Sequence, residues 1–477
     1  MPPPRPQSPP PLPEVRRRRR RLRWVGVGGL VLLEVSAALL TVAFLLWRSR
    51  TREEVQTRVA AIRAQGLPVN WEDLRRWPAE LPAAQNSAGL YTNALAQLHY
   101  EGRPGGAAVA LPGRGDAIAP ELRRFMLGAL KTNRVALELA ARAATSGPAR
   151  YPLDYSAGPA VATPHLDALL GLGELLSFQA LLSADAGHAS EAGQALETAL
   201  AAACSLDLEP LLGSQITAQH SLNRACRSLE RVLGRTALSE ATLQRLAVRL
   251  TAAEATNRMV LAVLGERAQG MDFLRLAQED YVALFDLLKR NLPEEEDAPV
   301  PPAAFKGLMR QARMFDRDRI FFMRAAETNL ALAATPAPAS LALGNPMVEL
   351  ESTAKGRLCF VASVMLRGMT FSVEADAIHH ATLRTTLAAL AVERWRLAHD
   401  GQLPDSLTVL TPDLLPESPT DPFTGEALRY QRRARGFVVY SLGPDRRDDA
   451  GKPRPPQAPQ GPAAAVENYD ISFAVER

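Results

Sequence analysis

The sequence predicts a mainly α-helical protein with one N-terminal transmembrane helix, an exported helical bundle and a small α+β module at the C-terminus. Three observations predict this fold class. Residues 24–47 form a long apolar run that carries a single formal charge. From about residue 51 to residue 350, apolar residues recur at helical spacing. After residue 400 the chain changes to turn formers and short β-rich segments, which are typical of a small antiparallel sheet.

The length of the chain indicates its number of domains, and its charge argues against one class of partner. A chain of 477 residues is long enough for about two or three domains, each with its own core. The formal net charge is +4, and much of the excess comes from the arginines at 16–21 and 23. Because the rest of the chain is close to neutral, the composition argues against a nucleic-acid-binding surface.

The apolar run from Trp24 to Trp47 is predicted to cross a membrane. At about 1.5 Å per residue it spans roughly 36 Å, which is enough for a bilayer. A cleaved signal peptide would have a shorter apolar core, of about 7–15 residues, so an uncleaved anchor is favoured. More arginines precede the run than follow it, and the positive-inside rule therefore places the N-terminus in the cytoplasm. We predict a single-pass protein of the inner (cytoplasmic) membrane whose bulk is periplasmic or otherwise extracytoplasmic.

The segments on either side of the anchor have different compositions. Residues 1–23 are rich in proline and arginine, and we expect them to form a disordered cytoplasmic tail. Residues 48–350 are predicted to be the exported helical bundle. Within it, residues 120–144 have the pattern of one amphipathic helix. Residues 165–205 predict two apolar helices joined by a turn at 185–187.

The second of these two helices resembles the second half of a tetratricopeptide repeat (TPR). The matching residues are Gly187, Glu191, Ala192, Leu196, Ala199 and Leu200. The resemblance covers about one repeat and implies closely packed, TPR-like α-hairpins. The segments "NWEDLRRWPAELPAAQNSAGLYTNAL" and "RYPLDYSAGPAVATPHL" resemble a group of uncharacterised membrane-anchored proteins from planctomycete-type bacteria. That second resemblance extends over most of the chain and implies no activity.

Residues 351–477 are predicted to form a long helix followed by a small antiparallel sheet. The helix is expected from about Ser352 to His399, with Gly401 as its left-handed cap and Pro404 preventing its continuation. The segments "LRY" and "FVVYSL" flank a short polar stretch, as the two strands of a hairpin do.

The order of these features resembles the globular end of the major pseudopilin of type II secretion systems. The matching residues are Arg396, Asp400, Gly401, Leu403, Pro404, Leu407, Asp421, Pro422, Gly425, Tyr430, Tyr440, Ser441, Gly443 and Asp445, with Asp470 in a final acidic turn. In that family a loop between strands holds calcium through oxygen ligands. The resemblance implies Asp445, Asp448, Asp449 and Asp470 as the calcium ligands of this chain. Two arginines, at 446 and 447, replace the glycine-rich family pattern, so a solvated acidic turn without metal is the alternative.

The N-terminal anchor also has a pilin-like feature. The segment "GLVLLEVSAALL" resembles the signal of type IV prepilins. In that signal a peptidase cleaves the chain after a glycine, and a glutamate occupies the fifth position of the mature protein. The resemblance implies Gly29 as the last leader residue, Leu30 as the first mature residue and Glu34 as the fifth. The alternative is a plain anchor that tolerates one carboxylate.

Cysteines and histidines give little indication of chemistry. Cys204 and Cys226 could form one disulfide bridge, which would leave Cys359 without a partner cysteine. The alternative is that they are buried free thiols. Asp376 lies three positions before His379 and four before His380, so its carboxylate and one imidazole could share a metal on one helix face. No third ligand is apparent, and solvated polar positions are the alternative. Common hydrolase, metalloprotease and nucleotide-binding motifs do not occur, so we expect a non-enzyme without a cofactor other than calcium.

These expectations combine into two main hypotheses of function. The first is a membrane-anchored, non-enzymatic structural or interaction protein of the cell envelope, linked to type II secretion or a pilus-like assembly. The second is a membrane-anchored TPR-like helical scaffold that binds protein partners. An envelope hydrolase with an unrecognised site comes third. The predicted partners are the lipid bilayer and envelope proteins, without nucleic acid.

Overall fold

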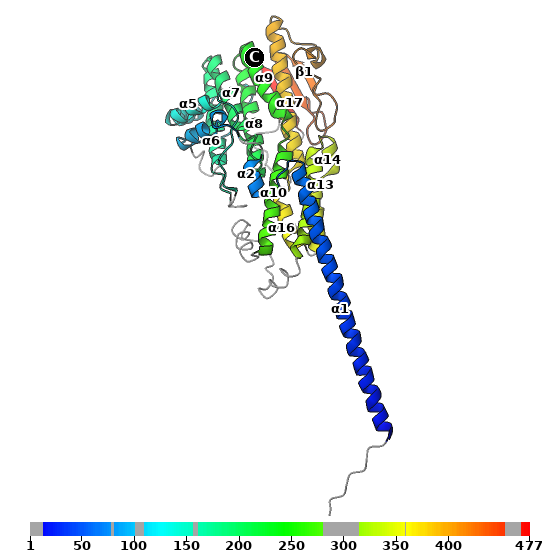
Figure 1. Ribbon diagram of the computed structural model, residues 1–477. Helices are drawn as coiled ribbons and strands as arrows, with labels where there is room; N and C mark the ends of the chain where they lie inside the picture. The colour runs from blue at the N-terminus through cyan, green and yellow to red at the C-terminus, as the bar shows by residue number, and fades with distance from the viewer. Residues whose placement is uncertain are drawn as a thin grey trace, which may run out of the picture.

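The computed structural model describes residues 13–77, 81–100, 109–155, 161–279, 314–357, 359–453 and 469–477. It is mainly helical, at 65%, with a three-stranded antiparallel sheet near the C-terminus, which confirms the predicted fold class at this level. One long helix extends away from a body of shorter helices (Figure 1). The sheet and the C-terminus lie at the end of the body that is far from the free part of this helix.

The long helix is α1 (Pro13–Ala64), 52 residues without interruption. From Leu30 to Leu46 its side chains are exposed, Leu32 and Leu40 at 71% each, so this part packs on nothing in the described chain. It is long and apolar enough to cross a membrane, as the sequence predicts. The helix begins at Pro13, and proline is well tolerated in the first turn of a helix. Residues 13–23 are therefore helical, whereas we expected them to belong to a disordered tail. Residues 1–12 lie outside the described residues.

The end of α1 enters a first hydrophobic core. Val55 and Ile62 are buried there, among side chains from five other helices. These helices are α2 (Trp71–Arg76), α10 (Arg258–Glu279), α13 (Met314–Ala334), α15 (Pro346–Gly356) and α16 (Phe360–Gly368). We call this group, with the last part of α1, the proximal unit.

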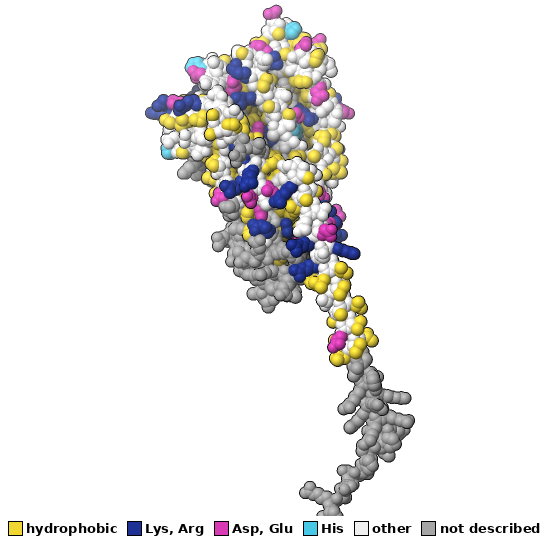
Figure 2. Space-filling view, viewed as in Figure 1, with side chains coloured by type: hydrophobic (Ala, Val, Ile, Leu, Met, Phe, Trp, Pro, Cys, Tyr) yellow, Lys and Arg dark blue, Asp and Glu magenta, His cyan; other side chains and the backbone are white. Residues whose placement is uncertain are grey.

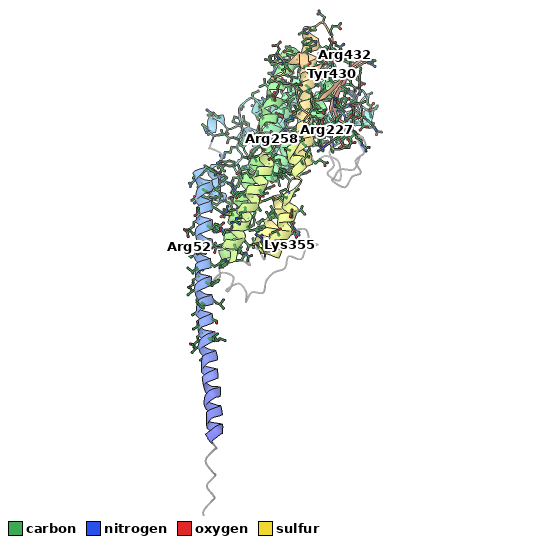
Figure 3. The ribbon with its side chains drawn as sticks, turned by 90° about the vertical axis from the view of Figure 1, so that its right-hand side faces the viewer. Arg52, Arg227, Arg258, Lys355, Tyr430 and Arg432 are labelled. Atoms are coloured by element: carbon green, nitrogen blue, oxygen red, sulfur yellow. The ribbon has the colours of Figure 1, made fainter. Side chains whose placement is uncertain are left out.

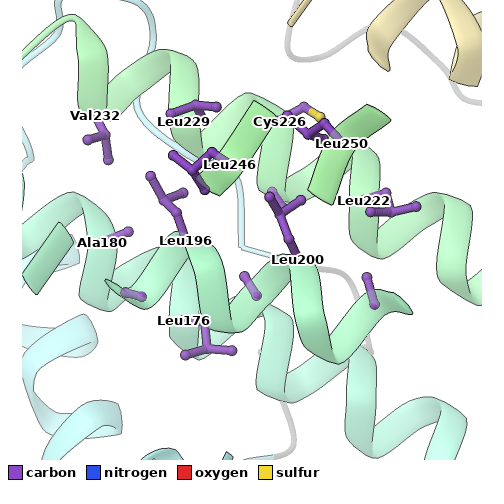
Figure 4. Close-up of a cluster of buried hydrophobic side chains, with 14 of the residues drawn as sticks. Leu176, Ala180, Leu196, Leu200, Leu222, Cys226, Leu229, Val232, Leu246 and Leu250 are labelled. Carbon is purple, nitrogen blue, oxygen red and sulfur yellow. The ribbon is translucent and has the colours of Figure 1, made fainter. Parts of the chain in front are cut away.

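A second and larger core joins the remaining helices to the sheet. Its helices are α3 (Ala88–Ala96), α4 (Pro120–Thr132), α5 (Arg134–Ala143), α6 (His165–Asp185), α7 (Ala189–Cys204), α8 (Leu212–Leu233), α9 (Glu240–Ala255) and α17 (Val373–Ala398). We call this group, with the sheet, the distal unit. Figure 4 shows leucines of α7, α8 and α9 meeting in it, among them Leu196, Leu229 and Leu246, each at most 1% exposed.

The predicted helix pair at 165–205 is present. Helices α6 and α7 pack against each other, and Gly187 turns the chain between them with a φ of +81°. Helix α6 is also apolar enough to span a membrane, but 61% of its apolar window is buried, so it is a core helix. Residues 120–144 form two helices rather than one. The buried Asn133 separates them, because its side chain accepts a hydrogen bond from the His99 amide at 2.6 Å.

The predicted long helix from Ser352 to His399 is wrong. The chain forms α15, α16 and α17 instead, after a short α14 (Ala339–Leu343). Helix α16 begins where the buried Asp318 of α13 accepts hydrogen bonds from the amides of Val361 and Ala362, both at 3.1 Å. Helix α17 begins at Ser372, whose hydroxyl caps the amide of Ala375. The break between the two cores therefore falls between α16 and α17, and not at the predicted domain boundary at residue 350.

The sheet has the order β1 (Arg429–Arg433), β2 (Gly436–Ser441), β3 (Ile471–Glu476). Strands β1 and β2 form the predicted hairpin, with Arg433 opposite Gly436. Helix α17 packs against β2 and β3 and ends at Ala398; Gly401, three residues later, has a φ of +84° and confirms the predicted left-handed cap. The 3-10 helices Ala83–Gln85 and Leu407–Leu410 complete the described elements, and the second buries Leu407 and Leu410.

Candidate functional site

The strongest candidate site is the segment between β2 and β3, which we call the acidic loop (residues 443–452 together with Asp470). The buried Asp421 fixes its start: its carboxylate accepts hydrogen bonds from the Ser441 hydroxyl and the Leu442 amide, both at 2.8 Å. Gly443 then turns the chain with a φ of +71°, a conformation that favours glycine. These contacts explain locally why the aspartate of "TDPFTG" and the glycine of "SLGPD" occur where they do.

Backbone amides bind three of the four predicted ligands within this loop. Asp470, 1% exposed, accepts hydrogen bonds through Oδ2 from the amides of Asp449 (3.1 Å) and Gly451 (2.7 Å). Asp445 accepts one from the amide two residues later, at 3.1 Å. Asp448 does the same at 2.9 Å, and it also accepts the Tyr440 hydroxyl at 3.0 Å. The loop therefore winds its backbone around Asp470.

Several buried carboxylate oxygens of the loop have no hydrogen-bond partner among the residues that the structure describes. They are Oδ2 of Asp445, Oδ2 of Asp449 and Oδ1 of Asp470. Leaving such an oxygen unpaired is costly, because it has lost water and gained nothing in exchange. Burial raises the pKa of Asp470 to about 6, and the nearby negative charges of Asp449 and Asp448 act in the same direction.

The chemistry of these donors suits a hard cation such as calcium, which prefers six to eight oxygen ligands. Their positions do not complete a site. Among the described residues, no group of three or more His, Cys, Asp or Glu is placed to hold a metal. Residues 454–468, which end two positions before Asp470, lie outside the described part. Arg446 and Arg447 are exposed. The loop thus supplies unsatisfied oxygens, and ligation would require the carboxylates to move closer together.

The predicted processing residues Gly29, Leu30 and Glu34 all lie in α1. Leu30 is 61% exposed and Glu34 is exposed too, on the part of α1 that extends away from the body. The surroundings of Gly29 lie outside the described part. Exposure leaves Glu34 accessible to a neighbouring chain.

The second candidate cluster, Asp376, His379 and His380, has structural partners. Asp376 accepts a hydrogen bond from Gln219 at 2.7 Å, and His379 is 2.7 Å from the side-chain oxygen of Asn223. Burial holds the pKa of His379 well below its usual value, so its imidazole is neutral. The hydrogen bonds of Asp376 and His379 join α17 to α8. Among the described residues, this cluster is not part of any group of three or more side chains that could hold a metal.

Sequence reasoning missed the residues that attach the sheet to the bundle. Glu230 of α8, 4% exposed, accepts the amide of Ala474 at 2.8 Å and the guanidinium of Arg114 at 2.7 Å. Arg114 also donates to the carbonyl of Ser472 at 2.5 Å. No local motif marks these residues, because the sheet residues are separated from their partners by 244 residues or more. The cysteines, whose pairing the sequence left open, are all free thiols.

The chain was compared with protein families, curated proteins and solved structures. No protein-family profile, no curated protein and no solved structure matches it.

Proposed function

We propose that this chain is a membrane-anchored, non-enzymatic structural or interaction protein of the cell envelope. Its N-terminus is cytoplasmic, and its body lies in the periplasm or outside the cytoplasm. The observation that carries the proposal is the rigid connection of α1 to the body. Arg58 of α1 pairs with Glu327 at 3.1 Å, and Glu54 pairs with Arg324 at 2.7 Å. Together with the buried Val55 and Ile62, these contacts hold the body in a fixed orientation on its anchor.

A fixed orientation matters for assembly with other proteins. The module formed by α17, the sheet and the acidic loop lies at the end of the body remote from the free part of α1 (Figure 1). An anchor without a hinge presents this module at a constant distance from the membrane. We propose that the module contacts other envelope proteins, in an assembly of the type II secretion or pilus-like kind.

The pilus-like route predicts processing between Gly29 and Leu30. We expect the mature protein to begin at Leu30, which N-terminal sequencing and intact mass measure directly. Substitution Gly29→Val should leave the chain at full length, since the peptidase requires glycine before the cleaved bond, whereas the matched Gly28→Val should still be cleaved. A mature chain that keeps the arginines at 16–21 would rule out the pilus-like route. The proposal of an anchored interaction protein would then rest on the plain anchor.

We also propose that the acidic loop binds calcium, supported by its three unsatisfied carboxylate oxygens. At about 10 mM calcium, an affinity typical of extracellular modules corresponds to about 1–3 kcal/mol of added stability. We expect calcium, but not magnesium, to raise the unfolding temperature of the detergent-solubilised chain. Asp470→Asn should abolish this rise, and the exposed Asp413→Asn should keep it. An equal rise in the Asp470→Asn variant would contradict the proposal.

The pH dependence of this effect has a defined sign. Because the pKa of Asp470 is raised from 3.8 to about 6, the calcium-free native state holds this proton more tightly than the unfolded chain does. Its contribution to stability is therefore full below about pH 4 and is lost as the pH rises to 6. Calcium binds the ionised carboxylate, so the stabilisation by calcium should grow over the same interval. Thermal unfolding with and without calcium from about pH 4 to about pH 8 measures both trends.

The scaffold hypothesis is the second candidate. The observation in its favour is the antiparallel pair α6 and α7. Both helices are largely buried by α4, α8 and α9, so the pair contributes to the core more than to an open groove. Cross-linking of the intact chain in membranes distinguishes the two candidates: partners cross-linked from exposed positions of α4 and α5 favour the scaffold, and partners cross-linked from β1 favour the module.

A further inference from the structure

A group of basic side chains surrounds the point where α1 leaves the body. Arg48, Arg50 and Arg52 follow the apolar span on α1. Arg317 comes from the first turns of α13, and Lys355 and Arg357 come from the end of α15. All of these side chains are exposed except Arg48, which is half-buried. We call these six residues the basic collar.

The ion pairs between α1 and α13 fix the height of the collar. Glu54 pairs with Arg324, and four residues later Arg58 pairs with Glu327, so the two helices run side by side in the same direction. Counting back along both helices at about 1.5 Å per residue, Arg317 lies about 10 Å below Arg324, level with Trp47 and Arg48. The start of α13 is therefore level with the end of the apolar span.

Helix α16 brings the third element to the same level. The amides of Val361 and Ala362 bind Asp318, the neighbour of Arg317. The corner between α15 and α16, with Arg357, must then lie beside the start of α13. Burial raises the pKa of Cys359, and the positive charges of Arg317 and Arg357 both oppose that rise, which is consistent with both side chains lying near one thiol. Figure 3 shows Arg52 and Lys355 at similar heights along α1, on different elements.

Within the described part of the chain, the charge of the collar is largely uncompensated. Lys355 is paired with Glu351 at 2.7 Å. The five arginines make no ion pair with any residue that the structure describes, and Glu53 is the exposed carboxylate next to Arg52. Figure 2 shows Lys and Arg side chains around the junction, above the apolar surface of α1. Trp47, 38% exposed, stands at the boundary, the position that aromatic side chains favour at the lipid interface.

We infer that the basic collar rests on the membrane surface and binds anionic lipid headgroups. A bilayer that ends at Trp47 brings its phosphates to the level of these side chains, and basic groups there attract anionic lipids over a distance of about one Debye length. The collar would thereby give the body a second attachment and fix its tilt. This inference rests on the proposed membrane anchor, because it requires α1 to span the bilayer, but it holds with or without cleavage after Gly29.

Energy transfer in nanodiscs tests this inference on the full chain. The exposed Ser352 on α15 is replaced, Ser352→Cys, and labelled with a donor dye, and the lipid headgroups bear the acceptor. Burial raises the pKa of Cys204 to about 12 and that of Cys226 and Cys359 to about 11, so labelling at neutral pH favours the introduced thiol. We expect more transfer in discs of phosphatidylglycerol than in discs of phosphatidylcholine. The difference should be lost at about 1 M salt, where the Debye length is only about 3 Å.

A charge-neutralised variant supplies the second arm. Arg317→Gln, Lys355→Gln and Arg357→Gln together should abolish the difference between the two lipids. The control removes three exposed arginines from the distal unit, Arg134→Gln, Arg142→Gln and Arg429→Gln, and should retain the difference. Equal transfer in both lipids for the unsubstituted collar, or an equal loss in the control, overturns the inference. Failure of the chain to enter discs at all would instead count against the anchor, and with it the proposed function.

Discussion

Replacing the last residue, Arg477→Ala, is expected to destabilise the protein by about 3 kcal/mol, because removing one partner of a buried ion pair leaves the other charge without compensation. Arg477 donates to the carboxylate of Glu393 on α17, which is 1% exposed, and to the carbonyl of Leu233 on α8 at 2.5 Å. The other nearby cation, Arg396, is 3.5 Å from Glu393 without a hydrogen bond. Urea unfolding of the detergent-solubilised chain, followed by circular dichroism, measures the loss.

Two further variants identify the cause of that loss. Adding Glu393→Gln to Arg477→Ala removes the stranded charge, so the double variant should recover part of the stability. Arg433→Ala breaks the neighbouring pair with Glu476, whose two side chains are 34% and 48% exposed, and should cost no more than about 1 kcal/mol. Equal losses for Arg433→Ala and Arg477→Ala would contradict a special role of the buried pair. Because α8, α17 and β3 meet at Arg477, its loss should also increase hydrogen exchange in β3.

Features that depend on neighbouring residues were predictable from sequence. The apolar helix α1, the pair α6 and α7, the cap at Gly401 and the hairpin β1–β2 each follow from a local composition, a periodicity or a turn former within a few residues. The number of helices between residues 346 and 398 was not predictable in this way. Asp318 determines the start of α16 from more than forty positions earlier in the chain, and nothing in the local pattern indicates that contact.

The same distinction applies to the candidate site. The four aspartates could be selected from their order in the chain, and the structure arranges them around a single loop. Which of their oxygens stay unpaired depends on backbone angles that sequence does not specify, such as the positive φ of Arg446 (57°) and Ala450 (56°). The basic collar could not be predicted either, since its residues come from distant parts of the chain and meet only through the packing of α1 on α13.

The joint between the two units should be the position most sensitive to added volume. Gly265 of α10 lies against the connection between α7 and α8, where a Cβ would be 1.6 Å from the carbonyl oxygen of Pro210 and 2.7 Å from its carbon. Both are backbone atoms, so neither can rotate away, and one helix must shift. We expect Gly265→Ala to destabilise the protein by about 3 kcal/mol, even though alanine would add up to about 1 kcal/mol of helix propensity.

A matched glycine separates the clash from helix propensity. Gly128, exposed in α4, has no atom within 4 Å of the position that an added Cβ would take, so Gly128→Ala should stabilise the chain by about 0.5–1 kcal/mol. Unfolding curves that shift in opposite directions for these two alanines support the close joint, and stabilisation by both would refute it. Because the proximal unit meets the distal unit at Gly265, a shifted joint changes the orientation of the C-terminal module relative to α1. Under the function proposed above, Gly265→Ala should therefore weaken the cross-linking of that module to its proposed envelope partners before the chain unfolds.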